Sequence, residues 1–432
     1  MAKIYKDFFN KNVLIVGYGV SGKGAEIALK HVGASVYILD ESKDKTIITQ
    51  KFVQNFDCAV VSPSISLAHK IYRFAEICGI EVMSEVELGA RLYRGTLIGI
   101  TGTNGKTTTA RLLGDMLTAG GLSTCVCGNI GYSFAQSVVE EPSDYAVVEL
   151  SSFQLEQMGT ILKPCIAMIT NISPDHLDRH GNMDAYASAK KNIANNQTAS
   201  DTLLLSYDDI PIEYLNDFTP KSNVLYVSVK ECVKGAYLQD GNLYYKEEAI
   251  VRSDAIALQG LHNISNALFC IAAAKILGVS NDAIRTALMN FKQDCHRIAH
   301  VATKYNKQFF NDSKGTNIGA TLAAARTMRG ITALILGGKD KGYDFDVLFK
   351  HLPSSVRYCF CIGETANLLI ESATRSGYPY AQKADSLEEA VRFSIATDAQ
   401  NVLLSPACSS FDSFKDYKDR GEQFEEIVKN VT

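Results

Sequence analysis

The chain has 432 residues, of which 46% are hydrophobic and 21% charged, a composition typical of a globular protein with about two to four domains. The formal net charge is −4 and charges of both signs are interspersed, so we expect no nucleic-acid partner. No stretch is long enough for a membrane span and residues 1–10 lack a signal-peptide core, so we expect a cytoplasmic protein without membrane insertion. The 11 cysteines include no CxxC pair, which favours reduced core residues over disulfides or zinc ligands.

Residues 1–93 alternate short apolar runs with helix-like segments, which predicts a small parallel α/β domain. Strands are expected at 13–16, 35–39 and 58–61, with a helix at 22–31. A glycine loop, Gly17-Tyr-Gly-Val-Ser-Gly22, joins the first strand to this helix, and Asp40 ends the second strand. Such a loop can bind a phosphate at the helix N-terminus, which suits NAD and a nucleoside diphosphate equally well.

A second α/β unit begins near residue 94 with a phosphate-binding loop. The segment TGTNGKTTT follows an apolar strand (95–100) and opens an amphipathic helix (106–118). Backbone N–H groups of such a loop can wrap a polyphosphate, the lysine can reach the terminal phosphates, and the first threonine hydroxyl suits a Mg²⁺ ligand. The residues concerned are Gly102, Thr103, Asn104, Gly105, Lys106, Thr107 and Thr108. We therefore expect a nucleoside triphosphate to bind here.

Polar residues follow the next apolar runs of this unit. Glu149 closes the run 145–150, where a Mg²⁺ ligand is expected beside a phosphate-binding loop. The run 165–170 leads into NISPDHLDRH, which contains two acids, two histidines and an arginine, and we favour His176 over His180 as functional. Lys190 and Lys191 lie on a helix, where lysine pairs are ordinarily solvated.

Short strands and turns follow residue 201, and then a helix from about 262 to 277. Asn266 lies one turn after His262, a spacing that N-capping by Asn263 does not explain. From residue 298 a third α/β unit is expected, with strands at 308–311, 331–336, 358–362 and 401–404. Its motifs NDSKGTN, which enters a helix at Thr316, GGKDKG and LSPACSSFD each follow a strand and so share one edge of a sheet.

Together these motifs resemble the Mur ligase family of ATP-dependent amide-forming enzymes, in the same order and over essentially the whole chain. The resemblance implies three α/β domains. Residues 1–93 would form a Rossmann-like UDP-binding domain, residues 94–297 a central P-loop domain with a parallel sheet and a small β-rich part, and residues 298–432 a Rossmann-like amino-acid-binding domain. Such enzymes phosphorylate a carboxylate with ATP, and an amine then attacks the acyl phosphate. A monomer is expected.

The resemblance also implies roles for single residues. Lys106, His176 and Lys190 would be catalytic, and two Mg²⁺ ions would be held by Thr107, Glu149, His176 and a carbamylated Lys190. ATP would contact the phosphate-binding loop and a set of later residues, Asn266, Arg297, Asp312 and Lys314. The UDP substrate would contact Gly17, Gly19, Ser21, Gly22, Asp40, Ser62, Asn129 and Ser151.

The NDSKGTN string is similar to that of family members that add D-glutamate to UDP-N-acetylmuramoyl-L-alanine, and the amino acid would then contact Thr316, Lys341, Ser410 and Tyr417. Ser64 departs from the family, which commonly has glycine in this loop near the uridine. Three other readings remain open: a folylpolyglutamate synthase-like ligase, an NAD-dependent oxidoreductase with an accessory NTPase, and a non-catalytic nucleotide-binding module.

Overall fold

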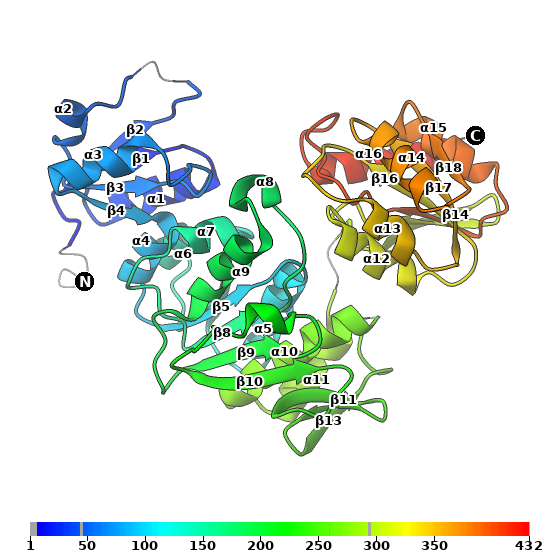
Figure 1. The fold of residues 1–432 in the computed structure, drawn as a ribbon. Coiled ribbons are helices and arrows are strands. Elements are labelled where there is room, and N and C mark those ends of the chain that lie inside the picture. Colours follow the sequence, from blue (N-terminus) through cyan, green and yellow to red (C-terminus); the bar gives the residue numbers. More distant parts are fainter. Residues whose placement is uncertain (1–6, 44–45, 259, 293–294, 432) are drawn as a thin grey trace. The chain divides into compact units, whose positions relative to one another are not determined.

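The computed structural model describes residues 7–43, 46–258, 260–292 and 295–431 (Figure 1). Residues 1–6, part of the segment examined for an export signal, lie outside this range. The chain divides into two compact units, Met1–Ile172 with Asp184–Phe291 and Ser173–Met183 with Lys292–Thr432. Within the described ranges no helix has the length and apolar character that crossing a membrane requires.

The first unit begins with a four-stranded parallel sheet in the order β2-β1-β3-β4. The two central strands, β1 and β3, are apolar runs buried at nearly every position, as expected for parallel strands covered on both faces, whereas the edge strands β2 and β4 are less buried. The elements are β1 (Asn12–Val16), α1 (Val20–His31), β2 (Ser35–Leu39), α2 (Gln50–Val53), β3 (Cys58–Val61), α3 (Lys70–Cys78), β4 (Glu81–Ser84) and α4 (Glu85–Leu92).

A nine-stranded sheet follows in the same unit, in the order β13-β12-β11-β10-β9-β8-β5-β7-β6. The pairs from β6 to β11 are parallel, and β12 and β13 are added antiparallel. The strands are β5 (Thr96–Thr101), β6 (Thr124–Gly128), β7 (Tyr145–Glu149), β8 (Ile166–Ile169), β9 (Thr202–Ser206), β10 (Asn223–Ser228), β11 (Gly235–Gln239), β12 (Asn242–Tyr245) and β13 (Glu248–Arg252). The helices are α5 (Lys106–Ala119), α6 (Phe134–Glu140), α7 (Ser152–Glu156), α9 (Met183–Lys191), α10 (Leu261–Ile276) and α11 (Asn281–Asn290).

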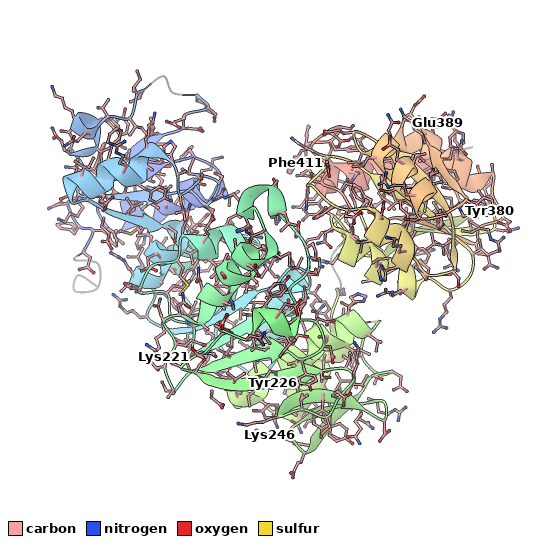
Figure 2. All side chains as sticks on the ribbon, in the orientation of Figure 1. Lys221, Tyr226, Lys246, Tyr380, Glu389 and Phe411 are labelled. Atoms are coloured by element: carbon pink, nitrogen blue, oxygen red, sulfur yellow. The ribbon has the colours of Figure 1, made fainter. Side chains whose placement is uncertain are left out.

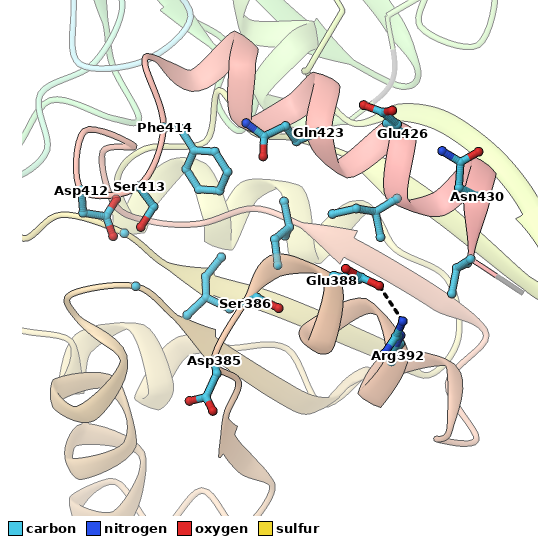
Figure 3. Close-up of a pocket in the computed structure, with 16 residues that line it drawn as sticks. Asp385, Ser386, Glu388, Arg392, Asp412, Ser413, Phe414, Gln423, Glu426 and Asn430 are labelled. Atoms are coloured by element: carbon cyan, nitrogen blue, oxygen red, sulfur yellow. Dashed lines mark hydrogen bonds and ion pairs between the residues drawn. The ribbon is translucent and has the colours of Figure 1, made fainter.

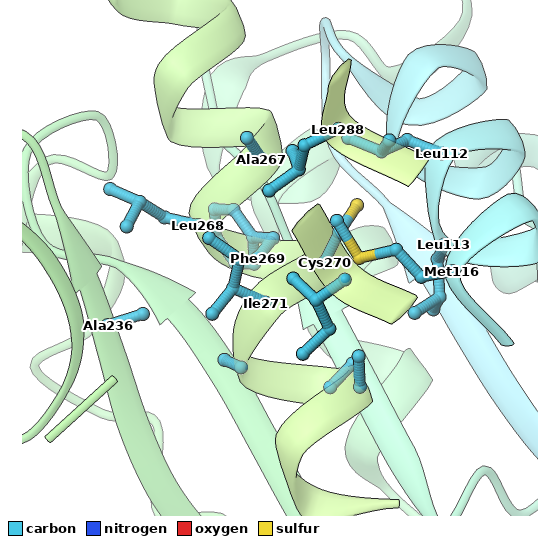
Figure 4. Packing of buried hydrophobic residues seen from close by; sticks show 14 of the residues in the cluster. Leu112, Leu113, Met116, Ala236, Ala267, Leu268, Phe269, Cys270, Ile271 and Leu288 are labelled. Atoms are coloured by element: carbon cyan, nitrogen blue, oxygen red, sulfur yellow. The ribbon is translucent and has the colours of Figure 1, made fainter. Parts of the chain in front are cut away.

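The core of this sheet domain forms where α10 packs against α5 (Figure 4). Helix α10 is apolar around most of its circumference, with Leu268, Phe269 and Ile271 fully buried, because it lies between the sheet and its neighbouring helices. Leu113 and Met116 of α5 belong to the same cluster. This packing fixes the helix that begins at Lys106 and so fixes the phosphate-binding loop before it.

The second unit is a six-stranded sheet in the order β14-β15-β19-β16-β17-β18, parallel except for the β14–β15 pair. One face packs on α12, α13 and α14 and the other on α15 and α16, because successive strand residues point to opposite faces. The strands are β14 (Ala299–Lys304), β15 (Lys307–Asn311), β16 (Thr332–Gly337), β17 (Val356–Ile362), β18 (Ala381–Lys383) and β19 (Asn401–Leu404). The helices are α8 (Leu177–His180), α12 (Ile318–Thr327), α13 (Asp346–His351), α14 (Ala366–Arg375), α15 (Leu387–Ile395) and α16 (Tyr417–Asn430).

The three-part α/β architecture expected from the sequence is confirmed, with one sheet for each part. The expected boundaries at 93/94 and 297/298 fall between α4 and β5 and just before β14, and they remain predictions. Two helix starts were placed wrongly. Helix α1 starts at Val20, two residues before the expected start at residue 22. Helix α12 starts at Ile318 instead of Thr316, because the Asn317 side chain caps it by accepting from the Ala320 N–H.

Candidate active site

The phosphate-binding loop joins β5 to α5, and its conformation requires glycine at Gly105. This residue has φ +84°, and a Cβ there would lie 2.3 Å from Asn266 Oδ1. Asn266 lies on α10, where Gly260, not Asn263, is the N-cap, and its amide donates to Asn263 Oδ1 (3.3 Å). The loop therefore rests against α10 through the very asparagine that the sequence singled out.

The segment after β8 holds the loop from its other side. Both backbone polar groups of Asn104 are hydrogen-bonded to this segment. Its N–H donates to Asn171 Oδ1 (2.8 Å), and its carbonyl accepts from Thr170 Oγ1 (2.7 Å) and Asn171 Nδ2 (2.9 Å). The sequence placed Thr170 and Asn171 at a strand end but assigned them no role. Their position after a buried strand beside β5 was the available signal.

Two lysines converge on the carbonyl of Gly102. Lys106 Nζ donates to Gly102 O and Thr103 O, both at 2.9 Å, and Lys190 Nζ donates to Gly102 O at 2.8 Å. Lys190 is only 1% exposed and lies 4.5 Å from the Tyr186 ring centroid. The expectation of a solvated lysine pair is therefore wrong for Lys190, because α9 turns this side chain under the phosphate-binding loop.

Glu149 ends β7 with one carboxylate oxygen bound and one orphaned. Its Oε1 accepts from Asn129 Nδ2 (2.9 Å), whereas Oε2 is buried without a hydrogen-bond partner among the described residues. A buried carboxylate oxygen at the carboxyl end of a parallel strand suits Mg²⁺, which prefers oxygen ligands.

Thr107 is buried in the first turn of α5, and Thr108 follows it. Ser151 caps α7, accepting from the Gln154 N–H (3.2 Å).

The glycine loop of the first sheet also forms as expected, between β1 and α1. It closes tightly, since a Cβ on Gly22 would lie 2.1 Å from the Gly17 carbonyl oxygen. Gly19 is the N-cap of α1, and Ser21 lies in its first turn. Asp40 follows β2 and accepts from the Ser42 hydroxyl (2.6 Å), which lowers the pKa of the Asp40 carboxyl.

The loop after β3 carries Ser62 and the family departure Ser64, whose hydroxyls lie 3.1 Å apart. A residue without a sequence signal supports this loop: Gln157 Nε2 donates to Ile65 O (2.8 Å) and, more weakly, to Ser62 O (3.4 Å). Gln157 is the C-cap of α7, the helix that follows strand β7 of the nine-stranded sheet.

The second unit gathers the predicted residues of the third domain at the carboxyl edge of its sheet. Asp312 follows β15 and accepts from Ser405 Oγ (2.6 Å). Burial raises the pKa of the Asp312 carboxyl to about 7, although Ser405 and the charge of Arg297 act in the opposite direction. Lys314 Nζ lies 5.5 Å from the Tyr417 ring centroid at the start of α16.

A buried ion pair joins Lys341 to Asp175, the neighbour of His176. Lys341 Nζ donates to Asp175 Oδ1 and to Thr316 O, both at 3.1 Å, and the Tyr343 hydroxyl donates to Asp175 Oδ1 at 2.6 Å. Burial raises the pKa of the Asp175 carboxyl, but Lys341, His176 and Tyr343 outweigh it and lower the pKa to about 2. The sequence indicated Lys341 but not its carboxylate partner.

Among the described residues of this unit, Arg420 is the largest fully buried side chain, and the sequence did not indicate it. Its guanidinium donates to Ser313 O (2.9 Å) and Cys408 O (3.3 Å), tying together the loops after β15 and β19. Burial lowers the pKa of Arg420 to about 10. Ser410 is buried in the second of these loops, and the next residue, Phe411, is 67% exposed (Figure 2).

The predicted residues are thus collected in two groups. The first unit holds the phosphate-binding loop, Glu149, Lys190, Asn129 and Asn266, and the second holds His176, Arg297, Asp312, Lys314, Thr316, Lys341, Ser410 and Tyr417. The expected Mg²⁺ ligands are divided between them, because residues 173–183 are grouped with the second unit. Across the described ranges, no three His, Cys, Asp or Glu side chains are placed to hold a metal ion together.

Residues 100–274 match the family model of the Mur ligase middle domain. Over 445 aligned residues, covering 98% of both chains, the sequence is 38% identical to the UDP-N-acetylmuramoylalanine--D-glutamate ligase of Caldanaerobacter subterraneus subsp. tengcongensis. The chain belongs to the Mur ligase family.

Solved structures of Mur ligases share the fold. A pseudomurein peptide ligase type C from Methanothermus fervidus aligns with a TM-score of 0.64 at 20% identity, covering 98% of this chain and 100% of that one. A MurF ligase from Thermotoga maritima, solved in complex with ADP, aligns with a TM-score of 0.60 at 14% identity, covering 99% of this chain and 97% of that one.

Proposed function

We propose that this Mur ligase joins D-glutamate to UDP-N-acetylmuramoyl-L-alanine at the expense of ATP. The observation that carries the proposal is 38% identity to a ligase of that name over 98% of both chains. The geometry supports it, since Lys106 and Lys190 converge on Gly102 O of a phosphate-binding loop, and the same unit carries a glycine loop suited to a UDP diphosphate. We further propose that the protein acts as a monomer in the cytoplasm.

In the proposed reaction, a carboxylate oxygen of the muramoyl substrate attacks the γ-phosphorus of ATP, and the bond to the bridging oxygen breaks to release ADP. The amine of D-glutamate then attacks the acyl phosphate, loses a proton and expels inorganic phosphate as the amide forms. Lys106 would offset the charge of the phosphates, which otherwise repel the incoming carboxylate. Gly102–Thr108 would bind the phosphates. Asn266 would contact the adenine, and Arg297, Asp312 and Lys314 would contact a phosphate or the ribose.

Mg²⁺ fits the first unit because Glu149 Oε2 is buried without a described partner and Thr107 is buried in the adjacent helix turn. When bound, Mg²⁺ would neutralise phosphate charge. We propose two Mg²⁺ ions, held by Thr107, Glu149, His176 and a carbamylated Lys190. Carbamylation would add the Lys190 amine to CO₂ with loss of a proton, and the resulting anionic group could bind Mg²⁺.

The amino acid would contact Thr316, Lys341, Ser410 and Tyr417. Asn129 and Ser151 would contact the muramoyl part of the substrate, and Gly17, Gly19, Ser21, Gly22, Asp40 and Ser62 the UDP part. The Ser64 hydroxyl lies within hydrogen-bonding distance of Ser62, which is compatible with a uridine loop that accepts serine at this position.

The test is phosphate release from ATP and Mg²⁺ in the presence of UDP-N-acetylmuramoyl-L-alanine and one of several amino acids. We expect release and amide formation with D-glutamate and not with L-glutamate, L-lysine or no amino acid. Turnover with another amino acid would retain the ligase class and overturn the D-glutamate assignment. Folded, ATP-binding protein that turns over none of them would overturn the proposed function.

A further inference from the structure

Three loops at the carboxyl edge of the four-stranded sheet carry the residues proposed to bind the UDP part of the substrate. The glycine loop follows β1, the loop of Asp40 follows β2 and the loop of Ser62 follows β3. Strand β1 lies between β2 and β3, and Gly17 contacts both sides. Its N–H donates to Leu39 O (2.8 Å) at the end of β2, and a Cβ on it would lie 2.8 Å from Ser62 Cβ. The three loops therefore form one edge of the kind where open α/β sheets bind ligands.

Glu41 links the two outer loops. It is the residue after Asp40, and its carboxylate pairs with His69 Nε2 (3.0 Å) and with Lys70 Nζ (3.2 Å). His69 is the N-cap of α3 and Lys70 its first residue, so both stand at the end of the loop that follows β3. Each oxygen of the Glu41 carboxylate has a partner of its own, Oε2 with the histidine and Oε1 with the lysine. The loop after β2 is thus bonded to the end of the loop after β3.

This link differs from the ion pairs that lie within one helix. In the pocket drawn in Figure 3, Glu388 pairs with Arg392 (2.6 Å), and both residues belong to α15. A pair of that kind adds to a helix and joins no two loops. Glu41 and His69 are 28 residues apart in the sequence and belong to separate loops. Their contact therefore restricts the position of one loop relative to the other.

The His69 ring is held on both of its nitrogens. Its Nδ1 accepts from the Ile71 N–H (3.3 Å) and so caps α3, which leaves Nε2 as the nitrogen that donates to Glu41. Partial burial raises the pKa of the Glu41 carboxyl, but His69 and Lys70 outweigh it and lower the pKa. The link therefore joins a carboxylate to a ring that is itself fixed to a helix.

We propose that Glu41 is a positioning residue for the UDP substrate, because its bonds to His69 and Lys70 hold the loop after β2 against the loop after β3. The inference rests on the proposed function, which assigns the UDP part of the substrate to this edge. Asp40 is oriented within its own turn, where the Ser42 N–H (3.2 Å) and hydroxyl (2.6 Å) donate to Asp40 Oδ1. The position of this turn therefore decides where the Asp40 carboxylate lies. A loop that is already in place loses less conformational freedom when the substrate binds.

The test is calorimetric titration of the full-length protein with UDP-N-acetylmuramoyl-L-alanine, and with ATP in parallel. Glu41→Ala should raise the Kd of the UDP substrate about fivefold and leave the Kd of ATP within about twofold, because two partly exposed pairs are lost. The direction is informative, since removing a negative charge near an anionic ligand would by itself strengthen binding. Glu41→Gln keeps an oxygen that can accept from His69, and it should recover part of the lost affinity.

Glu81→Ala is the matched control. Glu81 begins β4 at the opposite edge of the same sheet, is exposed and accepts from Arg91 Nη1 (2.9 Å). The substitution therefore changes the net charge equally and also breaks an ion pair, but it should leave the Kd of the UDP substrate within about twofold.

His69→Asn separates the link from the helix cap, because asparagine is a good N-cap but is too short to replace the contact with Glu41. It should weaken binding of the UDP substrate, and the double variant Glu41→Ala/His69→Asn should bind no more weakly than Glu41→Ala, since both changes remove the same contact. Additive losses in the double variant would mean that the two residues act separately, and they would overturn the inference.

Two further results would overturn it. If the parent protein binds the UDP substrate and Glu41→Ala binds it equally well or more tightly, the link does not position the loop, and the proposed function still stands. Equal weakening by Glu81→Ala would indicate a general loss of structure in the sheet. A folded, ATP-binding parent protein that binds no UDP substrate would overturn the proposed function itself, and this inference with it.

Discussion

Adjacent residues on α9 have different environments, and only one of them reaches the phosphate-binding loop. Lys190 is 1% exposed and donates to Gly102 O, whereas Lys191 donates to Tyr214 O and lies 5.7 Å from the Phe218 ring centroid. Successive helix residues differ by about 100° around the axis, so one faces the loop and the other a surface segment. A tandem lysine in the sequence does not reveal which of the two is buried.

This pair provides a test at the level of single residues. Lys190→Met should lower kcat by at least about a hundredfold, since it removes a contact with the phosphate-binding loop and the proposed anionic ligand. Lys191→Met keeps the helix and should remain within about threefold of the parent enzyme. Steady-state phosphate release measures both. Comparable losses in the two variants would contradict a specific role for Lys190.

At the scale of elements, α5 has a left-handed glycine near each end, and only one of them contacts another helix. Gly105 has φ +84° and would place a Cβ 2.3 Å from Asn266 Oδ1, while Gly121 has φ +80° and no atom within 4 Å of its Cβ position. Alanine costs roughly 1 kcal/mol at either site for the backbone alone. Only at Gly105 would the added Cβ also clash with Asn266, so that α10 or this side chain would have to move.

We therefore expect Gly105→Ala to weaken ADP binding by at least about tenfold and Gly121→Ala to leave it within about twofold. Titration with a fluorescent ADP analogue gives the dissociation constants, and thermal unfolding shows whether both variants lose similar stability from the backbone. If Gly105→Ala bound ADP normally, the contact with Asn266 would not control the loop.

Gln157 links an element of the nine-stranded sheet to a loop of the four-stranded sheet. Its amide donates to Ile65 O (2.8 Å) and Ser62 O (3.4 Å) in the loop proposed to bind uridine. Gln157→Leu removes both hydrogen bonds at similar volume, so the KM for the UDP substrate should rise about tenfold with the KM for ATP unchanged. The matched control is Gln54→Leu, an exposed glutamine after α2 that should leave both constants unchanged. A parallel rise in both KM values would indicate general loss of structure instead.

The elements were predictable because buried parallel strands are apolar runs that end at polar or glycine residues. β8 (IAMI) and β19 (NVLL) are buried at every position, and this pattern is visible without coordinates. The same logic placed Glu149 and Asp312 at carboxyl edges. It could not place Gln157, since its partners lie 92 and 95 residues away and their carbonyls carry no side-chain signal.

At the scale of the whole molecule, contacts between distant loops could not be predicted from the sequence. The sequence indicates that Arg420 is a surface residue on a polar helix, yet its side chain is fully buried and donates hydrogen bonds to Ser313 O and Cys408 O. Asp175 stood in a loop of many candidate ligands, and only the fold identifies it as the partner of Lys341. Motif order identified the family because it depends on short strings, whereas buried polar networks depend on how loops meet.

Each unit also contains a fully buried carboxyl whose ionisation opposes folding. Burial raises the pKa of Glu85 in the first unit and of Asp312 in the second to about 7. In the unfolded chain such groups ionise near pH 4, so between about pH 4 and 7 the folded state binds more protons. The free energy of unfolding should therefore fall as pH rises through this window and level off above it.

Urea unfolding at pH 5 and pH 8 tests this assignment unit by unit. Glu85→Gln and Asp312→Asn cannot ionise but keep an oxygen that can accept from the Ala135 N–H and the Ser405 hydroxyl, respectively. Each variant should lose less stability between the two pH values than the parent protein, by roughly 1–3 kcal/mol, and the two effects should add because the groups lie in separate units. Glu422→Gln, which removes an exposed carboxylate, should retain the parental pH dependence. Unchanged pH dependence in either buried-site variant would mean that its carboxyl ionises in the folded state near the ordinary pKa.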